Sequence, residues 1–404
     1  MKLNRYEYVL FLVFIFFTVL PACTKKYQLL PSSTVSFSPT ATVNDTNVII
    51  TMTATSTPTS TAINTIIATA TLSPTPLCVS ASYVTTLAGI SGVSGADNGP
   101  ALTSTFNGPE GIAVNSAGNI FVSDNAAIRE ITTSGMVSTF AGQVGIPGST
   151  NGVGTAAQFW TPEGIAVDAA GNIYVAEDLP SRIRKISSGA LVSNFAGGAG
   201  VFQDGMGTTA GFYNPRGVAV DSSGNIFVAD ENNNRIRMIT PAGLVSTFAG
   251  TGNVGASNGP VTSATFHGPF HVAVDSSGNV YVADVFNDLI RKISTSGMVS
   301  TLAGSGSAGS ADGMGTLASF GQPSGIAVDS NGNVYVADAP NKKIRKISPT
   351  GLVTTLAGTG LSGSTDGPGC EATFSLPGDV AVDSSGNVYV ADTGNHTIRK
   401  IQQY

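Results

Sequence analysis

Aromatic, acidic and basic side chains stand at two equivalent positions in three consecutive segments of the chain, spaced 53 and 54 residues apart. Large aromatic rings and arginine are the usual anchors of recognition surfaces, because they give a large contact area at low entropy cost. We therefore predict a binding site here, with the alternative that these side chains simply pack loops together. The candidate binding residues are Trp160, Glu163, Tyr213, Arg216, His267 and Phe270, together with the adjacent His271.

A second interpretation of the same region is catalytic. His271 and Asp379 stand where four equivalent segments have glycine, and Glu110 and Glu163 occupy a neighbouring position. An imidazole and carboxylates that converge could hold a metal ion or exchange protons, as in a metal-assisted hydrolase or lyase. The chain has three histidines in all, and it shows no Ser-His-Asp order, nucleophile elbow or phosphate loop. We therefore favour binding, predict no cofactor, and leave metal binding open.

Composition excludes two broad classes. The 404 residues include 25 acids and 19 bases, and 11% of the chain is charged. A nucleic-acid binder needs clustered Lys and Arg to displace counterions, and a wholly disordered chain needs high charge with few apolar groups. The hydrophobic content of 42%, with 49 glycines, instead indicates a compact fold rich in turns.

The first residues have the form of a secretory signal. Lys2 and Arg5 precede an apolar run over residues 8–20, which is short for a membrane span. The run ends in Leu-Pro-Ala-Cys, which resembles a bacterial lipobox in which the cysteine is lipidated after cleavage. The alternative is an ordinary cleaved signal that leaves a free cysteine. We expect a signal peptide over residues 1–22, lipid on Cys23, and a place in the bacterial cell envelope, periplasmic or surface-exposed.

Residues 23–83 differ in composition from the rest. Thr, Ser and Pro dominate, and bulky apolar residues come in pairs or triplets. Such a segment cannot bury enough surface to order itself, so it is predicted to be a disordered stalk that holds the globular part away from a membrane.

The remainder of the chain is one unit repeated six times. A copy reads PSGIAVDSNGNVYVADAPNKKIRKISPTGLVTTLAG from Pro323 to Gly358. Its short segments are rich in β-branched and aromatic residues and are bounded by Gly, Asn or Asp, so four strands per copy are expected. A glycine falls where the first hairpin needs a positive φ angle. The copies open at Pro109, Pro162, Pro215, Pro269, Pro323 and Pro377.

Both faces of the second strand are apolar, as when four-stranded sheets stack radially against their neighbours. The last copy ends after its third strand, whereas residues 84–89 match the missing fourth strand. An N-terminal strand that completes the last sheet would close the ring and leave no open edge. The sequence therefore predicts an all-β, six-bladed β-propeller of four-stranded blades over residues 84–404.

These repeats resemble a known family. The pattern Pro-x-Gly-(Ile/Val)-Ala-Val-Asp, then Gly-Asn-(Ile/Val)-(Tyr/Phe)-Val-Ala-Asp, then Asn-x-x-Ile-Arg is similar to the NHL repeat and covers about four fifths of the chain. The resemblance implies a propeller that binds proteins, peptides, nucleic acid or other ligands. A minority of related propellers are metal-dependent lyases or lactonases, which gives the catalytic alternative a site at the mouth of the central channel.

Features that recur in every copy are expected to serve the blade rather than a single site. An arginine of the third strand and an acid that ends the second recur six times, and we interpret them as structural ion pairs. With four lysines that follow it, this arginine position holds ten of the 19 bases, so no basic patch remains for nucleic acid. The phenylalanines are predicted to be wedges between blades: Phe106, Phe159, Phe212, Phe266, Phe320 and Phe374.

The chain has three cysteines, so lipid on one of them would leave two that could form a disulfide. With lipid on Cys23, Cys78 and Cys370 would remain in an oxidising compartment. The predicted strand order places them on opposite faces, although the stalk could reach across, so their pairing stays open. Taken together, the sequence predicts a monomeric, lipid-anchored binding or scaffold module. Its partner would be a protein, peptide or glycan, with no nucleic acid, and its membrane contact would run through Cys23.

Overall fold

The computed structural model describes residues 35–44, 47–56, 81–198 and 200–404, and the chain divides into two units, Met1–Leu77 and Cys78–Tyr404. In the first unit, β1 (Val35–Asn44) and β2 (Asn47–Ser56) pair antiparallel, with Val35 opposite Ser56. The β-branched residues of this stretch favour extended strands. The predicted signal peptide, the lipidation site Cys23 and the other parts of the predicted stalk before residue 81 lie outside the described residues.

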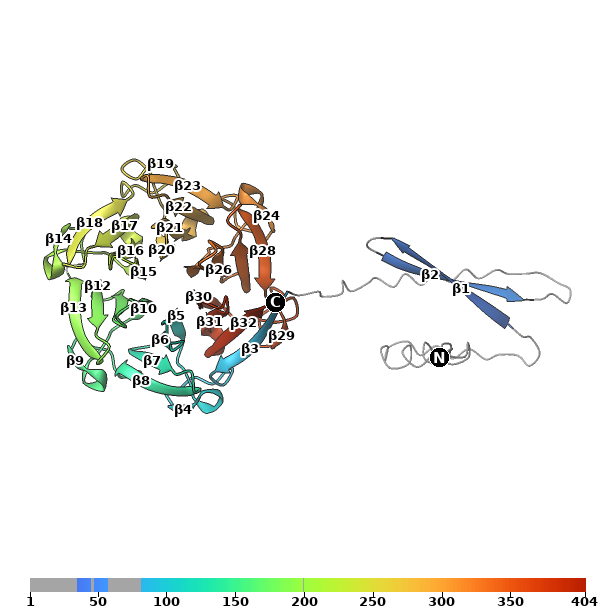
Figure 1. The fold of residues 1–404 in the computed structure, drawn as a ribbon, viewed down its shortest axis with the longest axis horizontal. Coiled ribbons are helices and arrows are strands. Elements are labelled where there is room, and N and C mark those ends of the chain that lie inside the picture. The colour runs from blue at the N-terminus through green and yellow to red at the C-terminus, as the bar shows by residue number, and fades with distance from the viewer. Residues whose placement is uncertain (1–34, 45–46, 57–80, 199) are drawn as a thin grey trace. The chain divides into compact units, whose positions relative to one another are not determined.

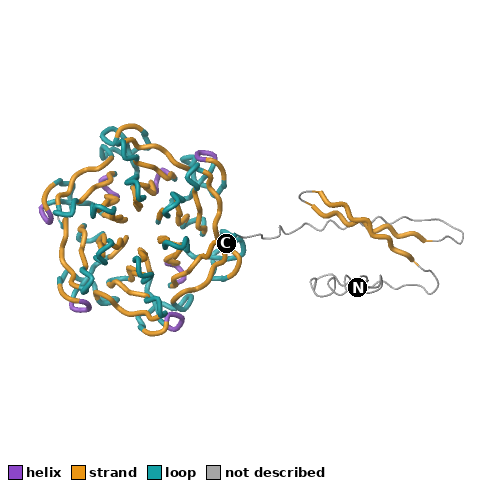
Figure 2. Tube along the Cα trace, in the orientation of Figure 1, coloured by secondary structure: helices purple, strands orange, loops and turns teal. Residues whose placement is uncertain are grey.

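The second unit is a ring of six β-sheets around a central axis, which confirms the six-bladed β-propeller (Figure 1). In each sheet the first strand lies toward the axis and the fourth lies at the rim, as β10 and β13 show in blade 2 (Figure 1). Every blade is antiparallel, and short loops join its strands (Figure 2).

The strands fall into five equivalent sets. First strands are β5 (Pro109–Val114), β10 (Pro162–Val167), β15 (Pro215–Val220), β20 (Pro269–Val274), β25 (Ile326–Val328) and β30 (Pro377–Val382). Second strands are β6 (Ile120–Asp124), β11 (Ile173–Glu177), β16 (Ile226–Asp230), β21 (Val280–Asp284), β26 (Val334–Asp338) and β31 (Val388–Asp392). Third strands are β7 (Ala127–Ile131), β12 (Arg182–Ile186), β17 (Arg235–Ile239), β22 (Leu289–Ile293), β27 (Lys343–Ile347) and β32 (Thr397–Gln403). Fourth strands are β8 (Met136–Gly142), β13 (Leu191–Gly197), β18 (Leu244–Ala249), β23 (Met298–Ala303), β28 (Leu352–Ala357) and β3 (Ser82–Ala88).

Each blade has a fifth strand, so the prediction of four strands per blade was wrong in this respect. The added strands are two residues long and pair with the start of the fourth strand. They lie in the loop that joins one blade to the next, and two residues are too few to show any alternation of apolar and polar side chains. The fifth strands are β4 (Gly99–Pro100), β9 (Gly152–Val153), β14 (Gly205–Met206), β19 (Gly259–Pro260), β24 (Gly313–Met314) and β29 (Gly367–Pro368).

The ring closes in blade 6 as predicted. The N-terminal strand β3 lies between β32 and β29, with Ser82 opposite Gln403 and Gly367 opposite Val84. The last sheet thus takes its fourth strand from the start of the propeller and its other strands from the end. Closure by hydrogen bonding removes the open sheet edge that would otherwise remain.

The core consists of six layers, one between each pair of neighbouring blades. Every predicted phenylalanine wedge is buried, and Phe212, for example, packs among residues of blades 2 and 3. The second strands are buried on both faces, as at Tyr335 and Val336. The hairpin glycines also match the prediction, since Gly332 and its five equivalents have φ between 80° and 86°. Apolar burial of about 25 cal/mol per Å² at six such interfaces is what holds the ring together.

Helical structure among the described residues is limited to seven three-residue 3₁₀ turns, four in blade connections and three after second strands. They are η1 (Ala101–Thr103), η2 (Gly154–Ala156), η3 (Gly207–Thr209), η4 (Glu231–Asn233), η5 (Val285–Asn287), η6 (Gly315–Leu317) and η7 (Thr393–Asn395). Over the described ranges, no helix has the length and apolar content needed to cross a bilayer.

Candidate functional site

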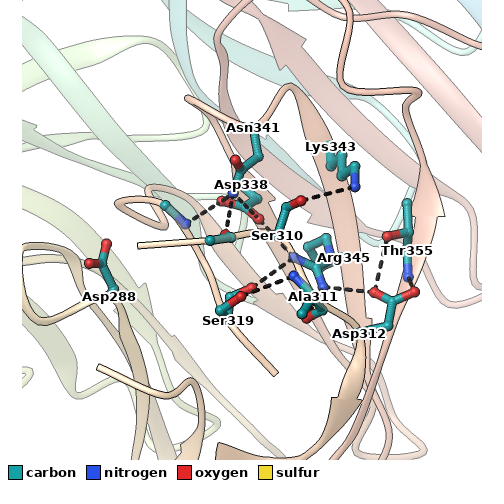
Figure 3. Close-up of polar contacts among 12 residues, drawn as sticks. Asp288, Ser310, Ala311, Asp312, Ser319, Asp338, Asn341, Lys343, Arg345 and Thr355 are labelled. Carbon is teal, nitrogen blue, oxygen red and sulfur yellow. Dashed lines mark hydrogen bonds and ion pairs between the residues drawn. The ribbon is translucent and has the colours of Figure 1, made fainter. Parts of the chain in front are cut away.

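A buried arginine links the strands of every blade, and blade 5 shows the arrangement (Figure 3). Arg345 Nη1 donates to Asp338 Oδ2 at 2.8 Å and to the Ser319 carbonyl at 3.1 Å. Arg345 Nη2 donates to Asp312 Oδ1 at 2.7 Å and to the Ala311 carbonyl at 2.9 Å. One side chain therefore joins the second strand, the third strand and the loop that enters the blade.

The predicted ion pair is present in all six blades, with Nη1 to carboxylate distances of 2.8–3.1 Å. Each guanidinium also lies over the ring of the blade's wedge phenylalanine, at 5.0–5.4 Å from the centroid. The arginines are fully buried, so these cations are unavailable to a ligand. The paired residues are Arg129 with Asp124, Arg184 with Glu177, Arg237 with Asp230, Arg291 with Asp284, Arg345 with Asp338 and Arg399 with Asp392.

Sequence reasoning missed the third member of this network. An Asn or Asp in the loop that enters each blade has a side-chain oxygen that accepts from the arginine in every blade. These residues are Asn98, Asn151, Asp204, Asn258, Asp312 and Asp366. The carboxylate that ends the second strand also accepts the backbone N–H of the residue after the wedge phenylalanine, as Glu177 does from Trp160 at 2.9 Å. The repeated network thus fixes the backbone from which the candidate site residues project.

A narrow pocket lies where the first strands of five blades meet near the axis. It contains four of the seven predicted binding residues and all four residues of the catalytic alternative, so side chains far apart in the sequence do converge. Its lining consists of Glu110, Gly111, Glu163, Gly164, Arg216, Phe270, His271, Gly378 and Asp379. We call this the mouth pocket.

Arg216 is the charged centre of the mouth pocket. Its Nη1 donates to Glu163 Oε1 at 2.6 Å, and its Nε donates to Glu231 Oε2 at 2.8 Å. Asp178 lies 3.7 Å from Nη2. The ring of Phe270 stacks against the guanidinium at 5.3 Å. One cation is therefore shared by three carboxylates from two neighbouring blades.

Glu231 and Asp178 were missed from the sequence, although a signal for them exists. Each directly follows the repeated acid of its second strand, and the other four copies have Asn, Val, Ala or Thr at that position. A doubled acid in two adjacent copies marks the blades on either side of Arg216.

Burial disturbs the pocket carboxyls. Burial raises the pKa of Glu163 to about 7, and the charge of Arg216 only partly offsets the rise. Burial is also the largest cause of a raised pKa at Glu110. The charge of Arg216 opposes this rise, and the charge of Asp379 adds to it. For Asp379 burial is the largest cause of a raised pKa, with His271 and two backbone N–H groups opposing it. Burial therefore favours the neutral form of these carboxyls, and the acids of the pocket outnumber its single arginine.

His271 and Asp379 face each other across the axis. His271 Nε2 lies 3.4 Å from Asp379 Oδ2, and the two residues are 7% and 3% exposed. Asp379 Oδ2 accepts from the backbone N–H of Ile112 at 3.0 Å. Asp379 Oδ1 and both imidazole nitrogens are buried without a hydrogen-bond partner among the described residues. Buried polar atoms are rarely left in this state, since an unmade hydrogen bond costs roughly 1–3 kcal/mol.

Close approach of the first strands explains the glycines found at this position elsewhere. A Cβ added at Gly217 would lie 2.5 Å from the Cα of His271, and one at Gly325 would lie 2.4 Å from the Cα of Asp379. Each strand therefore needs glycine where the next blade presses on it. His271 and Asp379 are the two copies in which this position carries a side chain.

The three remaining predicted residues, Trp160, Tyr213 and His267, lie outside the mouth pocket. Each precedes one of its lining residues by three positions in the chain. Trp160 is 46% exposed and Tyr213 is 49% exposed. Trp160 Nε1 donates to Ser149 Oγ at 3.1 Å, and the ring of His267 packs against Phe286 at 5.1 Å. The predicted binding residues are thus divided into a polar group that lines the mouth pocket and an exposed aromatic group outside it. Binding at either group stays a prediction.

The metal question was left open by the sequence. Within the described ranges, no group of three or more His, Cys, Asp and Glu side chains is arranged to hold a metal ion. His271 meets one carboxylate, and Glu163 is already paired with Arg216. The residues present therefore do not form a metal-binding set, and we derive no catalytic step through a metal.

Cys370 is disulfide-bonded, and the other two cysteines of the chain, Cys23 and Cys78, lie outside the described residues. The strand order that placed Cys78 and Cys370 on opposite faces did not include β29, which brings the Cys370 segment beside the start of β3. The backbone N–H of Gly369 donates to the Ser82 carbonyl at 2.9 Å, because the unforeseen strand β29 pairs with the start of β3.

Comparison with known proteins agrees with the fold. A family model described as NHL repeat matches residues 212–237, 320–347 and 374–401, and one described as Teneurin NHL domain matches residues 90–153. The six-bladed propeller defines the class of the protein. The matched segments lie in blades 1, 3, 5 and 6, and there they confirm the NHL repeats that the pattern of the sequence had predicted.

Several curated proteins are similar over most of the propeller. Protein SUPPRESSOR OF QUENCHING 1, chloroplastic, from Arabidopsis thaliana is 30% identical over 335 residues, which cover 76% of this chain and 31% of that protein. Human NHL repeat-containing protein 2 is 30% identical over 293 residues, covering 63% of this chain and 40% of the relative. The chain thus spans well under half the length of these relatives.

Solved structures with the same fold are more distant in sequence. A structural genomics protein of unknown function from Bacteroides thetaiotaomicron has a TM-score of 0.62 at 22% identity, with 80% of this chain and 76% of that chain covered. A protein from the same organism titled an auxiliary nutrient binding protein has a TM-score of 0.61 at 18% identity, with the same coverage. At these identities the likeness shows the fold alone.

Proposed function

We propose that the protein is a lipid-anchored binding module of the bacterial cell envelope that recognises a protein, peptide or glycan through the face around the channel mouth. The observation that carries the binding role is the grouping of unshared features on this face. Exposed Trp160 and Tyr213 each precede by three residues a residue of a pocket whose acids outnumber its bases. Aromatic rings supply contact area, and a partly desolvated charged pocket supplies orientation.

The repeat supports this proposal by subtraction. The arginine, carboxylate and phenylalanine of each blade are buried and engaged with one another, so their presence is explained by the fold. Trp160, Arg216 and His271 have no identical residue at the equivalent position of another copy, so blade geometry does not require these side chains.

Arrays of peptides and glycans test the binding role directly. The full-length chain is applied to both arrays, and ligands that bind are measured again with Trp160→Ala and Tyr213→Ala. We expect each variant to lose at least tenfold in affinity. The matched control is Leu191→Ala, because Leu191 is a similarly exposed apolar side chain of β13 at the start of that rim strand. Equal binding by all four proteins would contradict the proposal.

Lipid anchoring rests on the sequence and has its own test. The intact protein is expected to fractionate with membranes and to carry an acylated Cys23 by mass spectrometry. Cys23→Ala should move it to the aqueous fraction, because a single apolar signal run that is removed leaves no other anchor in the predicted scheme. A Cys23→Ala protein that still fractionates with membranes would contradict the anchor.

A metal-dependent lyase or lactonase is the second candidate, and one observation favours it. Glu110, Glu163, His271 and Asp379 do line a single pocket. Elemental analysis of the full-length chain decides the matter. About one metal ion per chain, lost in His271→Ala, would support catalysis over binding.

A further inference from the structure

The mouth pocket has an unbalanced charge. Glu110, Glu163 and Asp379 line it, whereas Arg216 is its single arginine or lysine. Arg216 is also engaged by Glu231 and Asp178. Glu110 takes part in no hydrogen bond or ion pair with the described residues, and it is exposed at the rim of the pocket, although the surrounding protein desolvates its carboxyl enough to raise its pKa. A free carboxylate therefore stands beside a cation that is already satisfied.

Deeper in the pocket, acceptors lack donors. Asp379 Oδ1 and the imidazole nitrogens of His271 are buried and without partners among the described residues. A carboxylate accepts and cannot donate, and a neutral imidazole offers one acceptor nitrogen. Asp379 Oδ1 thus lacks a hydrogen-bond donor, preferably a cationic one, whereas the imidazole of His271 offers one acceptor nitrogen and one N–H.

Size narrows the choice of donor. The free space of the pocket is about 10 Å³, which is room for one water-sized group. A primary ammonium has that size and carries three N–H donors with no acceptor. A guanidinium is a planar group of several heavy atoms and is too large. An anion would meet three carboxylates, and Arg216 cannot turn toward it without breaking its own contacts.

We propose that the mouth pocket binds a protonated primary amine of the ligand, held by Glu110 at the rim and by Asp379 and His271 at the inner wall. This inference rests on the proposed binding function and names the group that the pocket recognises. A lysine side chain and an amino sugar both present such a group. The exposed rings of Trp160 and Tyr213 would contact the part of the ligand that carries the amine.

The raised pKa of Glu163 gives the proposal an independent readout. A bound cation favours the ionised carboxylate, so binding should release protons near pH 7. The charged and titratable groups that face Glu163 are Glu110, Asp178, Glu231 and Arg216, with Asp379 and His271 beyond them in the same pocket.

The test uses the full-length chain and the probe n-butylammonium, with n-butanol as the neutral probe of equal shape. Trp160 is the one tryptophan of the chain and reports binding by fluorescence. Calorimetry at pH 7 in two buffers of different ionisation enthalpy counts protons. We expect n-butylammonium to bind at least tenfold more tightly than n-butanol and to release a measurable fraction of one proton.

Isosteric variants locate the site. Glu110→Gln should weaken n-butylammonium binding at least tenfold, and its exposed side chain makes loss of the fold a poor explanation. Glu163→Gln should abolish most of the proton release. Glu371→Gln, an exposed acid after β29 in blade 6, is the matched control and should bind as the unaltered protein does.

The outcomes separate this inference from the proposed function. Equal binding of the two probes, or unchanged binding in Glu110→Gln, would overturn the amine site even if Trp160→Ala abolishes array binding. An amine site with array binding indifferent to Trp160 would instead overturn the role of the aromatic face. Nα-acetyl-lysine methylamide and glucosamine are then compared as probes. Tighter binding of the first assigns the amine to a peptide, and tighter binding of the second assigns it to a sugar.

Discussion

Two arginine clusters in this propeller differ in every respect except their chemistry. Arg345 lies in blade 5 with Asp338 as its buried partner, and Asp312 and two backbone carbonyls accept its other hydrogen bonds. Arg216 lies beside the axis with three carboxylates around it, and its side chain is 22% exposed. The first arrangement recurs in six blades and is closed to solvent, whereas the second occurs once and is open.

The difference teaches how to sort charges in a repeat protein. A charge pair demanded by the blade is repeated with its whole set of hydrogen bonds, because the same backbone surrounds it each time. A cluster that occurs once, holds surplus acid and leaves its cation partly exposed has no such structural cause. It is therefore the better candidate for a site.

The largest effect is expected from breaking a repeated pair. Arg345→Met should lower the free energy of unfolding by about 3–5 kcal/mol, because it leaves the buried carboxylate of Asp338 without its cation. Urea unfolding followed by fluorescence measures the change. Lys292→Met is the control, since this third-strand lysine lies over Tyr281 without an ion pair, and it should cost under about 1 kcal/mol. A small loss in Arg345→Met would remove the basis for calling the repeated pairs structural.

Stability against pH gives the next effect. The pKa of Glu163 is raised in the folded state from 4.5 to about 7. Its stabilising contribution is therefore fully present below pH 4.5 and is lost as the pH rises through 7. Glu163→Gln should flatten the unfolding curve between those values and be the more stable protein at pH 8, by up to roughly 3 kcal/mol. The same slope in both proteins between pH 4.5 and 7 would refute this origin.

Removing the cation of the single cluster should cost less than breaking a repeated pair. Arg216→Met is expected to destabilise by about 1–2 kcal/mol, since its surroundings are partly solvated and its acids can take up protons. The pKa of Glu163 should rise further, because Arg216 is the charge that lowers it. Carboxyl NMR of the variant measures this, and a fall in that pKa would contradict the assigned charge balance.

The smallest effect on stability is expected at the exposed aromatic face. Trp160→Ala should change the free energy of unfolding by no more than about 0.5 kcal/mol, as is usual for an exposed side chain. Its neighbour Phe159 is a fully buried wedge, so Phe159→Ala should cost about 3–5 kcal/mol. A large destabilisation in Trp160→Ala would mean that the ring serves packing, which was the alternative to binding.

Most of the fold could be predicted because each blade repeats the same sequence pattern. Six copies of the glycine turn, of the wedge represented by Phe212, and of the arginine all pointed to one architecture. Strand β29 could not be predicted, because two residues carry no periodicity, and the strand order that placed Cys370 therefore lacked it. Within the site, the positions of Arg216 and His271 could be inferred from the breaks in the pattern. The sharing of Arg216 by Asp178 and Glu231 depends on how two loops pack against each other, which spacing does not show.

Carboxyl ¹³C NMR of the full-length chain, labelled at glutamate, tests the central claim most directly. The claim is that the acids of the mouth pocket outnumber its cations, so that a cationic ligand group would favour their ionised form. The account predicts that Glu163, assigned with Glu163→Gln, titrates near pH 7 and shifts to lower pH when n-butylammonium is added. A midpoint near 4.5 that n-butylammonium leaves unchanged would contradict it.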